Sequence, residues 1–162
     1  ELLKSMRVHG KGTSKYDNVR IGMNSRLDTI QAAILLAKFP VFQEMELKSC
    51  QKIAALYTQE LKDIVKTPVV KEGYLSSWAQ YTIQMRDREE RDGLQNYLKK
   101  YKIPSAVYYQ KPMHLQKAFA SNKYDESDYV VTDRLCDIVV SLPFHPYMDE
   151  AQVEEITLRI RE

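Results

Sequence analysis

The amino-acid sequence predicts an α+β fold in which a small, mostly antiparallel sheet is covered by helices. Several segments repeat apolar residues at helical spacing, whereas a few short segments alternate apolar with polar residues or are continuously apolar. Along the chain these segments follow the order helix, strand, helix, strand, helix, strand, helix. Because the strands are short, helices must pack on the sheet to complete a core, as in other α+β domains.

A long loop is predicted over residues 9–26, near the start of the chain. Three of the five glycines lie there, at Gly10, Gly12 and Gly22, and the same stretch holds the polar residues Thr13, Ser14, Asp17, Asn18, Asn24 and Ser25. Loops of this length inside compact domains often carry function.

The chain has no initiator Met, and both of its ends have helical sequence. We therefore expect it to be a piece of a longer protein.

A long helix is predicted to follow this loop. Asp28 with Gln31 resembles a capping box, which satisfies free N–H groups at a helix start. Apolar residues then recur at helical spacing as far as Met45 and again from Ile53 to Ile64. Pro40 lies inside this segment and is expected to kink or interrupt the helix, because proline removes a hydrogen bond and clashes with the preceding turn.

The clearest strand is predicted over residues 78–85. There Tyr81, Ile83 and Met85 alternate with polar residues, as in a half-buried strand. Shorter strands are predicted at residues 69–70, 106–109 and 138–142.

Further helices are predicted between and after these strands. One begins at Asp87, and Gly93 in its interior weakens it by about 1 kcal/mol relative to Ala. Another is expected over residues 128–137. The last begins at Asp149, which forms a capping box with Gln152, and it turns inward the apolar residues Val153, Ile156 and Ile160.

The composition excludes several classes of protein. The 162 residues include 24 Lys and Arg and 22 Asp and Glu, for a net charge of +2, which gives no electrostatic case for a nucleic-acid or membrane-surface binder. No apolar run approaches the roughly 20 residues of a membrane span. We expect Cys50 and Cys136 to be reduced core thiols in a cytoplasmic protein, and no metal, since His9, His114 and His145 stand without ligand spacing.

Two segments have residues suited to binding anions. The glycine run from Gly10 to Lys15 lacks the spacing of a phosphate-binding P-loop, so nucleotide hydrolysis is not predicted. Asn24 and Arg26 directly precede the long helix, whose free N–H groups attract anions, and the Arg fork suits phosphate or carboxylate. From spacing alone, a surface loop ending in the helix cap at Asp28 is the favoured interpretation.

A polar and aromatic cluster is predicted around the strand at residues 106–109. Tyr108 and Tyr109 are followed by Lys111 and His114, and such side chains can stack on and hydrogen-bond a planar or sugar-like ligand. On composition alone, an amphipathic strand edge is favoured, and single histidines are more often structural than catalytic.

Several of these segments together resemble the DegT/StrS-type (DegT/DnrJ/EryC/StrS) sugar aminotransferases, which are pyridoxal-phosphate enzymes of fold type I. The most specific part is the run Gly-x-Asn-x-Arg-Leu-x-x-Ile-Gln-Ala-Ala beginning at Gly22. Essentially the whole chain is covered, in the family's order, by this run and by matching segments at residues 7–10, 78–83, 112–114 and 141–146.

The resemblance implies that this chain is the C-terminal portion of such an enzyme. The family's cofactor-bearing lysine and the Asp beside the pyridine nitrogen precede the matching segments. No catalytic residue is therefore assigned in the chain, since Lys4, Lys11 and Lys15 lie outside the family's lysine motif. Residues 1–26 would be the end of the large domain with the active-site loop, and residues 27–162 the C-terminal small domain.

The resemblance also implies roles for five residues. Asn24 matches the family Asn that reaches into the neighbouring subunit and binds the cofactor phosphate. Arg26 matches a position that faces substrate in relatives acting on nucleotide-linked keto sugars. Tyr108 and Tyr109 fall where those relatives have a His-Tyr or Tyr-Tyr pair near the sugar nucleotide. His114 lies in the family's Pro-Leu-His segment and is a further substrate-binding candidate.

The expected function is transfer of an amino group, with glutamate as the expected donor, to a nucleotide-linked keto sugar. The motif residues are most similar to those of enzymes that aminate UDP-linked 3-keto sugars. Relatives that aminate C4 share many of the same residues, so amination at C4 is the alternative. A non-catalytic regulatory or sensing relative and a structural dimerisation module are the alternatives. We expect a cytoplasmic homodimer with shared active sites in cell-surface polysaccharide biosynthesis, and an isolated chain that is inactive without the upstream lysine.

Overall fold

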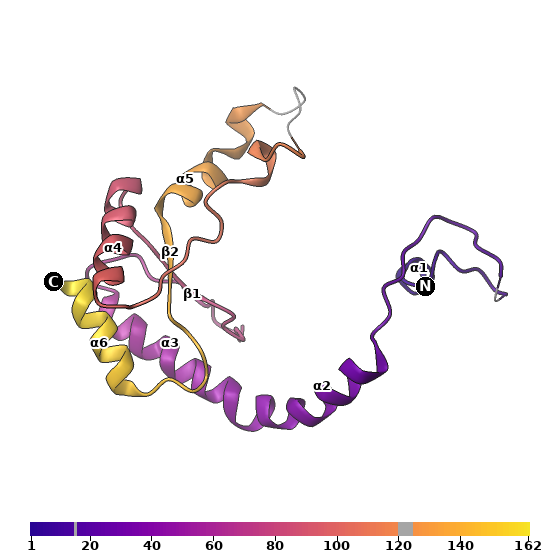
Figure 1. Cartoon of the computed structure of the whole chain (residues 1–162), viewed down its shortest axis with the longest axis horizontal. Helices are drawn as coiled ribbons and strands as arrows, with labels where there is room; N and C mark the ends of the chain where they lie inside the picture. Colours follow the sequence, from indigo (N-terminus) through magenta and orange to yellow (C-terminus); the bar gives the residue numbers. More distant parts are fainter. Residues whose placement is uncertain (15, 120–124) are drawn as a thin grey trace. The chain divides into compact units, whose positions relative to one another are not determined.

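The computed structural model describes residues 1–14, 16–119 and 125–162, and the chain divides into two compact units, Glu1–Gln43 and Glu44–Glu162. Each unit has its own helices, and the sheet belongs to the second (Figure 1). This division follows the density of internal contacts. The functional domain boundary expected between residues 26 and 27 stays a prediction.

The N-terminal unit contains a short helix, α1 (Leu2–Met6), the predicted loop, and the helix α2 (Thr29–Val41). The loop has no regular strand in its described residues, although isolated bridges join Val8 to Asn24 and Lys11 to Asn18. Asp28 is the N-cap of α2, as predicted, and its carboxylate accepts a hydrogen bond from the N–H of Ile30 at 2.8 Å.

Pro40 disturbs the long helix in a specific way. The α-helical segment α2 continues through Pro40, and a π-helical turn, η1 (Phe42–Glu46), follows it before the α-helix resumes as α3 (Leu47–Leu61). Proline removes one hydrogen bond of the helical ladder, and π-turns accommodate such a change of register. The predicted interruption is therefore confirmed as a π-turn within a helical stretch.

Helix α2 has an unusual surface for an exposed helix. It is apolar on every side, with Lys38 as its one charged residue, and none of its residues is buried by the described parts of the chain. Ile30 is 73% exposed and Leu36 is 77% exposed. Helices that are apolar all round are normally buried. The apolar surface of α2 therefore requires a cover that the described residues do not provide.

The sheet of the C-terminal unit consists of β1 (Tyr81–Gln84) and β2 (Val139–Leu142), paired antiparallel. The register places Tyr81 opposite Leu142 and Gln84 opposite Val139. In β1 the side chains alternate between buried and half-buried, which confirms the predicted half-buried strand. All of β2 is buried, as its continuous apolar sequence suggested.

Two of the predicted strands are wrong. Residues 69–70 do not pair with the sheet; instead Lys66 forms a single bridge with Gln84. Pro68 follows shortly after and has no N–H with which to extend a ladder. The predicted strand at residues 106–109 is reduced to one bridge between Ala106 and Ser141, because the chain turns away at Tyr108.

Helices α4 (Arg88–Lys100), α5 (Val130–Ile138) and α6 (Glu150–Arg161) complete this unit, with short 3-10 turns η2 (Met113–Leu115) and η3 (Glu126–Tyr129). Helix α6 packs beside α3, and α4 contacts α5 and α6 (Figure 1). Asp87 caps α4, and Asp149 forms the full capping box with Gln152 at the start of α6, as predicted. The structure thus confirms the predicted α+β class.

The core of the C-terminal unit centres on two tyrosines. Tyr57 of α3 and Tyr81 of β1 are both fully buried, and their rings stack with centroids 4.9 Å apart. The hydroxyl of Tyr57 donates to the carbonyl oxygen of Pro143 at 2.9 Å, and that of Tyr81 lies 2.7 Å from the hydroxyl of Thr58. Burial raises the pKa of Tyr57 above its ordinary value, so the hydroxyl keeps the proton that it donates.

Apolar residues of α3, β1, α4, β2 and α6, together with Ile103 after α4, surround this pair: Ile53, Ala54, Leu61, Ile83, Leu98, Ile103, Val140, Leu142, Val153 and Ile156. Both cysteines are free and buried, which confirms their interpretation as core thiols.

We predict that Gly93→Ala stabilises the C-terminal unit by about 1 kcal/mol. Gly93 lies inside α4, a Cβ there would meet no atom within 4 Å, and alanine is the better helix former. The free energy of unfolding can be measured by urea titration followed through the fluorescence of Trp78, the single tryptophan, which lies in this unit.

Gly73→Ala is the matched control for this prediction. A Cβ at Gly73 also meets open space, but the φ angle of Gly73 is +80°, where alanine is disfavoured by roughly 1–2 kcal/mol. This substitution should therefore destabilise the unit. Equal effects of the two substitutions would show that helix propensity is not the cause.

Candidate functional site

The N-terminal unit brings Asn24 and Arg26 into direct contact. The Nε of Arg26 donates to the side-chain oxygen Oδ1 of Asn24 at 3.1 Å, and both side chains are exposed. The backbone of Asn24 is held by its bridge to Val8. The structure therefore places two of the predicted site residues together, ahead of the capped start of α2.

Arg7 is a third member of this cluster that the sequence did not indicate. Its Nε donates to the carbonyl oxygen of Ser25 at 3.1 Å, while the N–H of Ser25 donates to the carbonyl oxygen of Arg7 at 2.9 Å. Arg7 thus hydrogen-bonds Ser25, the residue between Asn24 and Arg26, through both its main chain and its side chain. Arg7 and Ser25 are 18 residues apart in the sequence, so the contact becomes visible only when the two sides of the loop are seen to pair.

Glycine is required where the two sides of the loop approach each other. A Cβ at Gly22 would lie 2.1 Å from the N of Gly10, and one at Gly10 would lie 1.8 Å from the carbonyl oxygen of Arg20. Gly10 also has a φ of +73°. Only glycine fits such a close approach of two backbones. The loop is therefore a packed structure that fixes the position of the segment carrying Asn24 and Arg26.

The N-terminal unit is cationic, although the whole chain is nearly neutral. Residues 1–43 contain seven Lys and Arg and three Asp and Glu, giving +4, while residues 44–162 contain seventeen and nineteen, giving −2. A cationic surface that presents a guanidinium and a neutral amide donor is suited to a phosphate group. The residues present therefore fit the phosphate of pyridoxal phosphate, the cofactor expected from the sequence.

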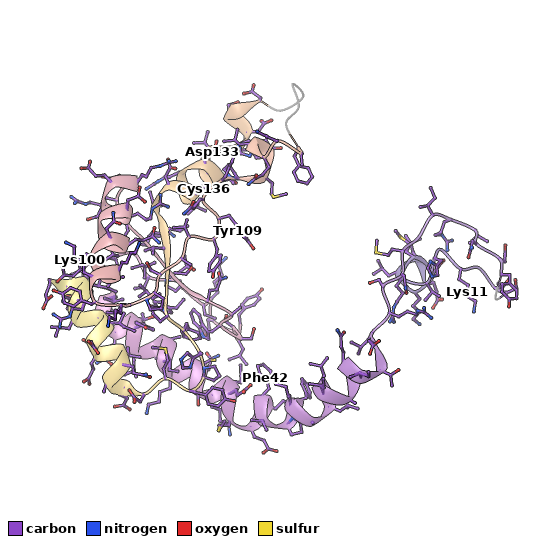
Figure 2. All side chains as sticks on the ribbon, viewed as in Figure 1. Lys11, Phe42, Lys100, Tyr109, Asp133 and Cys136 are labelled. Carbon is purple, nitrogen blue, oxygen red and sulfur yellow. The ribbon has the colours of Figure 1, made fainter. Side chains whose placement is uncertain are left out.

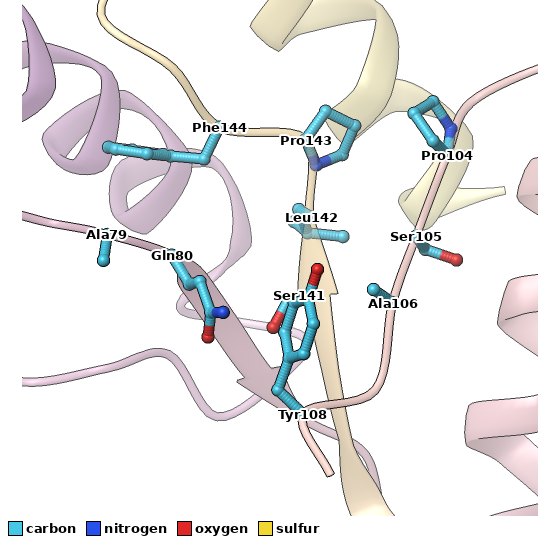
Figure 3. Close-up of a pocket in the computed structure, with 10 residues that line it drawn as sticks. All are labelled: Ala79, Gln80, Pro104, Ser105, Ala106, Tyr108, Ser141, Leu142, Pro143 and Phe144. Atoms are coloured by element: carbon cyan, nitrogen blue, oxygen red, sulfur yellow. The ribbon is translucent and has the colours of Figure 1, made fainter. Parts of the chain in front are cut away.

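Tyr108 borders a cavity in the C-terminal unit. The cavity has a volume of about 250 Å³ and is lined by the end of β2 with the two residues after it, by Ala79 and Gln80 just before β1, and by the segment from Pro104 to Tyr108. Figure 3 shows the ring of Tyr108 beside Ser141, with Gln80 on one side and Ser105 on the other. The otherwise apolar cavity has a few polar groups, which is the usual composition of a small-molecule site. They belong to Gln80, Ser105, Tyr108 and Ser141.

Tyr109 has a different environment from its neighbour. It does not line this cavity, and the residue is 74% exposed (Figure 2). Its ring meets that of Tyr108 edge to face, with the ring centroids 5.9 Å apart. The two tyrosine rings thus contact each other, with Tyr108 lining the cavity and Tyr109 exposed outside it.

His114 is held by other protein groups and does not line the Tyr108 cavity. Its Nε2 lies 3.1 Å from Oδ1 of Asp133 on α5, and its ring stacks on Tyr129 with centroids 4.4 Å apart. The side chain is only 8% exposed. These contacts describe a structural histidine that ties the η2 turn to α5, and a role in substrate binding stays a prediction.

The predicted site residues thus fall on both units, with Asn24 and Arg26 on one and Tyr108, Tyr109 and His114 on the other. Within residues 1–14, 16–119 and 125–162 there is no group of three His, Cys, Asp or Glu side chains placed to hold a metal ion. Over the same residues, no helix combines the length and apolar character needed to cross a bilayer.

Comparison with known proteins identifies the family. A UDP-2-acetamido-2-deoxy-3-oxo-D-glucuronate aminotransferase of Pseudomonas aeruginosa is 40% identical over 155 residues, which are 95% of this chain and 41% of that protein. A pleiotropic regulatory protein of Geobacillus stearothermophilus is 38% identical over 166 residues, covering 100% of this chain and 43% of the relative. This chain therefore spans about two fifths of the length of these relatives.

A solved structure shows the same fold. The crystal structure of a DegT DnrJ EryC1 StrS aminotransferase from Brucella abortus superposes with a TM-score of 0.85 and 45% sequence identity, over 99% of this chain and 42% of that one. The family description "DegT/DnrJ/EryC1/StrS aminotransferase family" matches residues 1–161. Because this match covers nearly every residue, the chain belongs to the DegT/DnrJ/EryC1/StrS aminotransferase family.

Proposed function

We propose that the full-length protein containing this chain transfers an amino group from glutamate to a nucleotide-linked keto sugar, with pyridoxal phosphate as cofactor. The observation that carries the proposal is the 40% identity to the Pseudomonas aeruginosa enzyme, whose name states a UDP-linked 3-oxo sugar. The cationic loop with Asn24 and Arg26 supports it, because sugar nucleotides and the cofactor are both anionic. A UDP-linked 3-keto sugar is the proposed substrate, and a 4-keto sugar nucleotide is the second choice.

This chain contributes binding groups to the cofactor. When bound, pyridoxal phosphate supplies the electron sink that makes transfer of an amino group feasible. Asn24 would donate its side-chain N–H to the phosphate in the neighbouring subunit of a homodimer, within the electropositive surroundings of the N-terminal unit. The catalytic lysine is not assigned to any residue here and would lie in the remainder of the full-length enzyme.

Two kinds of side chain are the proposed substrate ligands, the charged guanidinium of Arg26 and the aromatic rings of Tyr108 and Tyr109. The terminal Nη atoms of Arg26 form a planar fork suited to a diphosphate or a carboxylate. Tyr108 and Tyr109 present rings that pack on a sugar or a base and hydroxyls that orient it. The cavity beside Tyr108 is slightly smaller than a typical ligand pocket, so it would take part of the ligand rather than all of it.

A second candidate function is regulation without catalysis. The relative from Geobacillus stearothermophilus is named a pleiotropic regulatory protein and is nearly as similar as the enzyme. A purely structural role in dimerisation is the third candidate.

The aminotransferase role would place the protein in the cytoplasm, as an enzyme of cell-surface polysaccharide biosynthesis.

The proposal predicts that the full-length protein aminates UDP-linked keto sugars in the presence of glutamate and pyridoxal phosphate. A panel of UDP-, dTDP- and GDP-linked 3-keto and 4-keto sugars can be assayed by mass spectrometry of the amino-sugar product. The isolated 162-residue chain should bind no cofactor stably, because none of its lysines matches the family's catalytic motif. A full-length protein that carries no cofactor and aminates none of these sugars would favour the regulatory role.

Asn24→Ala in the full-length enzyme should weaken cofactor binding without changing the fold. The side chain is exposed, and the lost hydrogen bond to a charged phosphate is worth about 1.5–3 kcal/mol. Because the contact is proposed to cross subunits, mixing Asn24→Ala subunits with subunits lacking the catalytic lysine should restore part of the activity. No recovery under conditions of demonstrated subunit exchange would exclude the contact between subunits.

Tyr108→Ala should impair the reaction with the keto sugar and spare the reaction with glutamate. Loss of ring contact worth about 1.4 kcal/mol lowers kcat/KM for the sugar about tenfold. Tyr108→His should be tolerated, since family members have His at this position. The exposed Tyr74, outside the Tyr108 cavity, provides a control through Tyr74→Ala. Single-turnover kinetics of each half-reaction would refute the assignment if both slowed equally in Tyr108→Ala.

A further inference from the structure

We infer that Arg26 is a positioning residue for Asn24, and that it orients the Asn24 amide so that the amide N–H₂ group faces the cofactor phosphate. The inference rests on the proposed role of Asn24 and adds a function for Arg26 beyond contact with the substrate. It comes from the hydrogen bond that joins the two side chains, in which Nε of Arg26 and Oδ1 of Asn24 are 3.1 Å apart.

The chemistry of the two groups fixes which way the amide points. The Nε of arginine can only donate a hydrogen bond, so the Asn24 atom that faces it must be the carbonyl oxygen. The oxygen and nitrogen of an amide diverge from the same planar carbon and so face different directions. The bond to Arg26 therefore turns the two N–H donors of Asn24 away from the guanidinium and leaves them available for an acceptor. An amide free to rotate would present its oxygen to the phosphate for part of the time, and that contact is repulsive.

The backbone beneath the two side chains is also restrained. Ser25, which lies between them, donates its main-chain N–H to the carbonyl oxygen of Arg7 at 2.9 Å, and its own carbonyl oxygen accepts from the Nε of Arg7 at 3.1 Å. Asn24 itself is bridged to Val8. Because these contacts restrain the backbone of Asn24 and Ser25, the orientation of the Asn24 amide depends mainly on its own side-chain torsions. The Arg26 contact is the one observed constraint on those torsions among the described residues.

Arg26 can carry out both roles at once. Its Nε is used for Asn24, whereas Nη1 and Nη2 bond no other group in the described parts of the chain. The terminal fork is therefore available to an anionic group of the substrate. Lysine keeps the positive charge but lacks the Nε–H and the fork, so it cannot hold Asn24 and an anion together.

The test is a double-mutant cycle on the dissociation constant of pyridoxal phosphate, measured by equilibrium dialysis with the full-length enzyme. Pyridoxal, which lacks the phosphate, is the second probe. Asn24→Ala should weaken pyridoxal phosphate about tenfold or more, as expected for a hydrogen bond to a charged group. Arg26→Lys should weaken it about three- to tenfold in the presence of Asn24 and have no further effect in the Asn24→Ala background. Neither substitution should change the affinity for pyridoxal.

Arg20→Lys is the matched control. Arg20 lies in the same loop and bonds the hydroxyl of Ser5, so the same exchange is made without touching Asn24. Its affinity for pyridoxal phosphate should equal that of the unaltered enzyme.

The other outcomes separate the inference from the proposed function. Equal losses from Arg26→Lys in both backgrounds would show that Arg26 acts independently of Asn24, and no loss at all would show that it does not act on the cofactor; either result overturns the positioning role while Asn24 keeps its own. An unchanged dissociation constant in Asn24→Ala would overturn the assignment of Asn24 to the phosphate and the positioning role with it.

Discussion

The hydrogen bond from the buried hydroxyl of Tyr57 to the carbonyl oxygen of Pro143 organises the C-terminal unit. A polar group in a fully buried position must find a partner, and the carbonyl that serves here belongs to the residue directly after β2. Tyr57 also stacks on Tyr81, so α3, β1 and the end of β2 meet at one point. Pro143 and Phe144 form part of the wall of the Tyr108 cavity. The packing of the core thereby fixes one wall of the candidate binding site.

The motifs that identify the family in the C-terminal unit are largely structural. The Nε1 of Trp78 donates to Gln51 on α3, and the rings of Tyr81 and Phe144 stack with centroids 6.3 Å apart. Trp78, Tyr81 and Phe144 lie in the segments at 78–83 and 141–146 that carried the resemblance. They preserve the core, whereas the groups with binding chemistry lie on the exposed loop of the N-terminal unit and at Tyr108. Family resemblance here identifies the scaffold more securely than it identifies the ligand.

The sequence predicted local features well and distant pairings poorly. The caps at Asp28, Asp87 and Asp149 were predictable because each carboxylate bonds a backbone N–H within three residues. The strands expected at 69–70 and 106–109 were wrong because pairing depends on partners far along the chain and on whether the next residues can continue a ladder. The contact of Arg7 with Ser25 and that of His114 with Asp133 went undetected for the same reason, since neither spacing corresponds to a local pattern.

The apolar surface of α2 has a consequence for how the polypeptide reaches its final form. The C-terminal unit has its own buried core, centred on Tyr57 and Tyr81. Helix α2 gains little from its own unit and becomes stable only when other protein surface covers Ile30, Leu36 and their neighbours. Substitutions in α2 should therefore act on the association of parts rather than on the folding of any one part. The loop that carries Asn24 is joined to this helix, so the placement of the proposed phosphate-binding amide would depend on the same association.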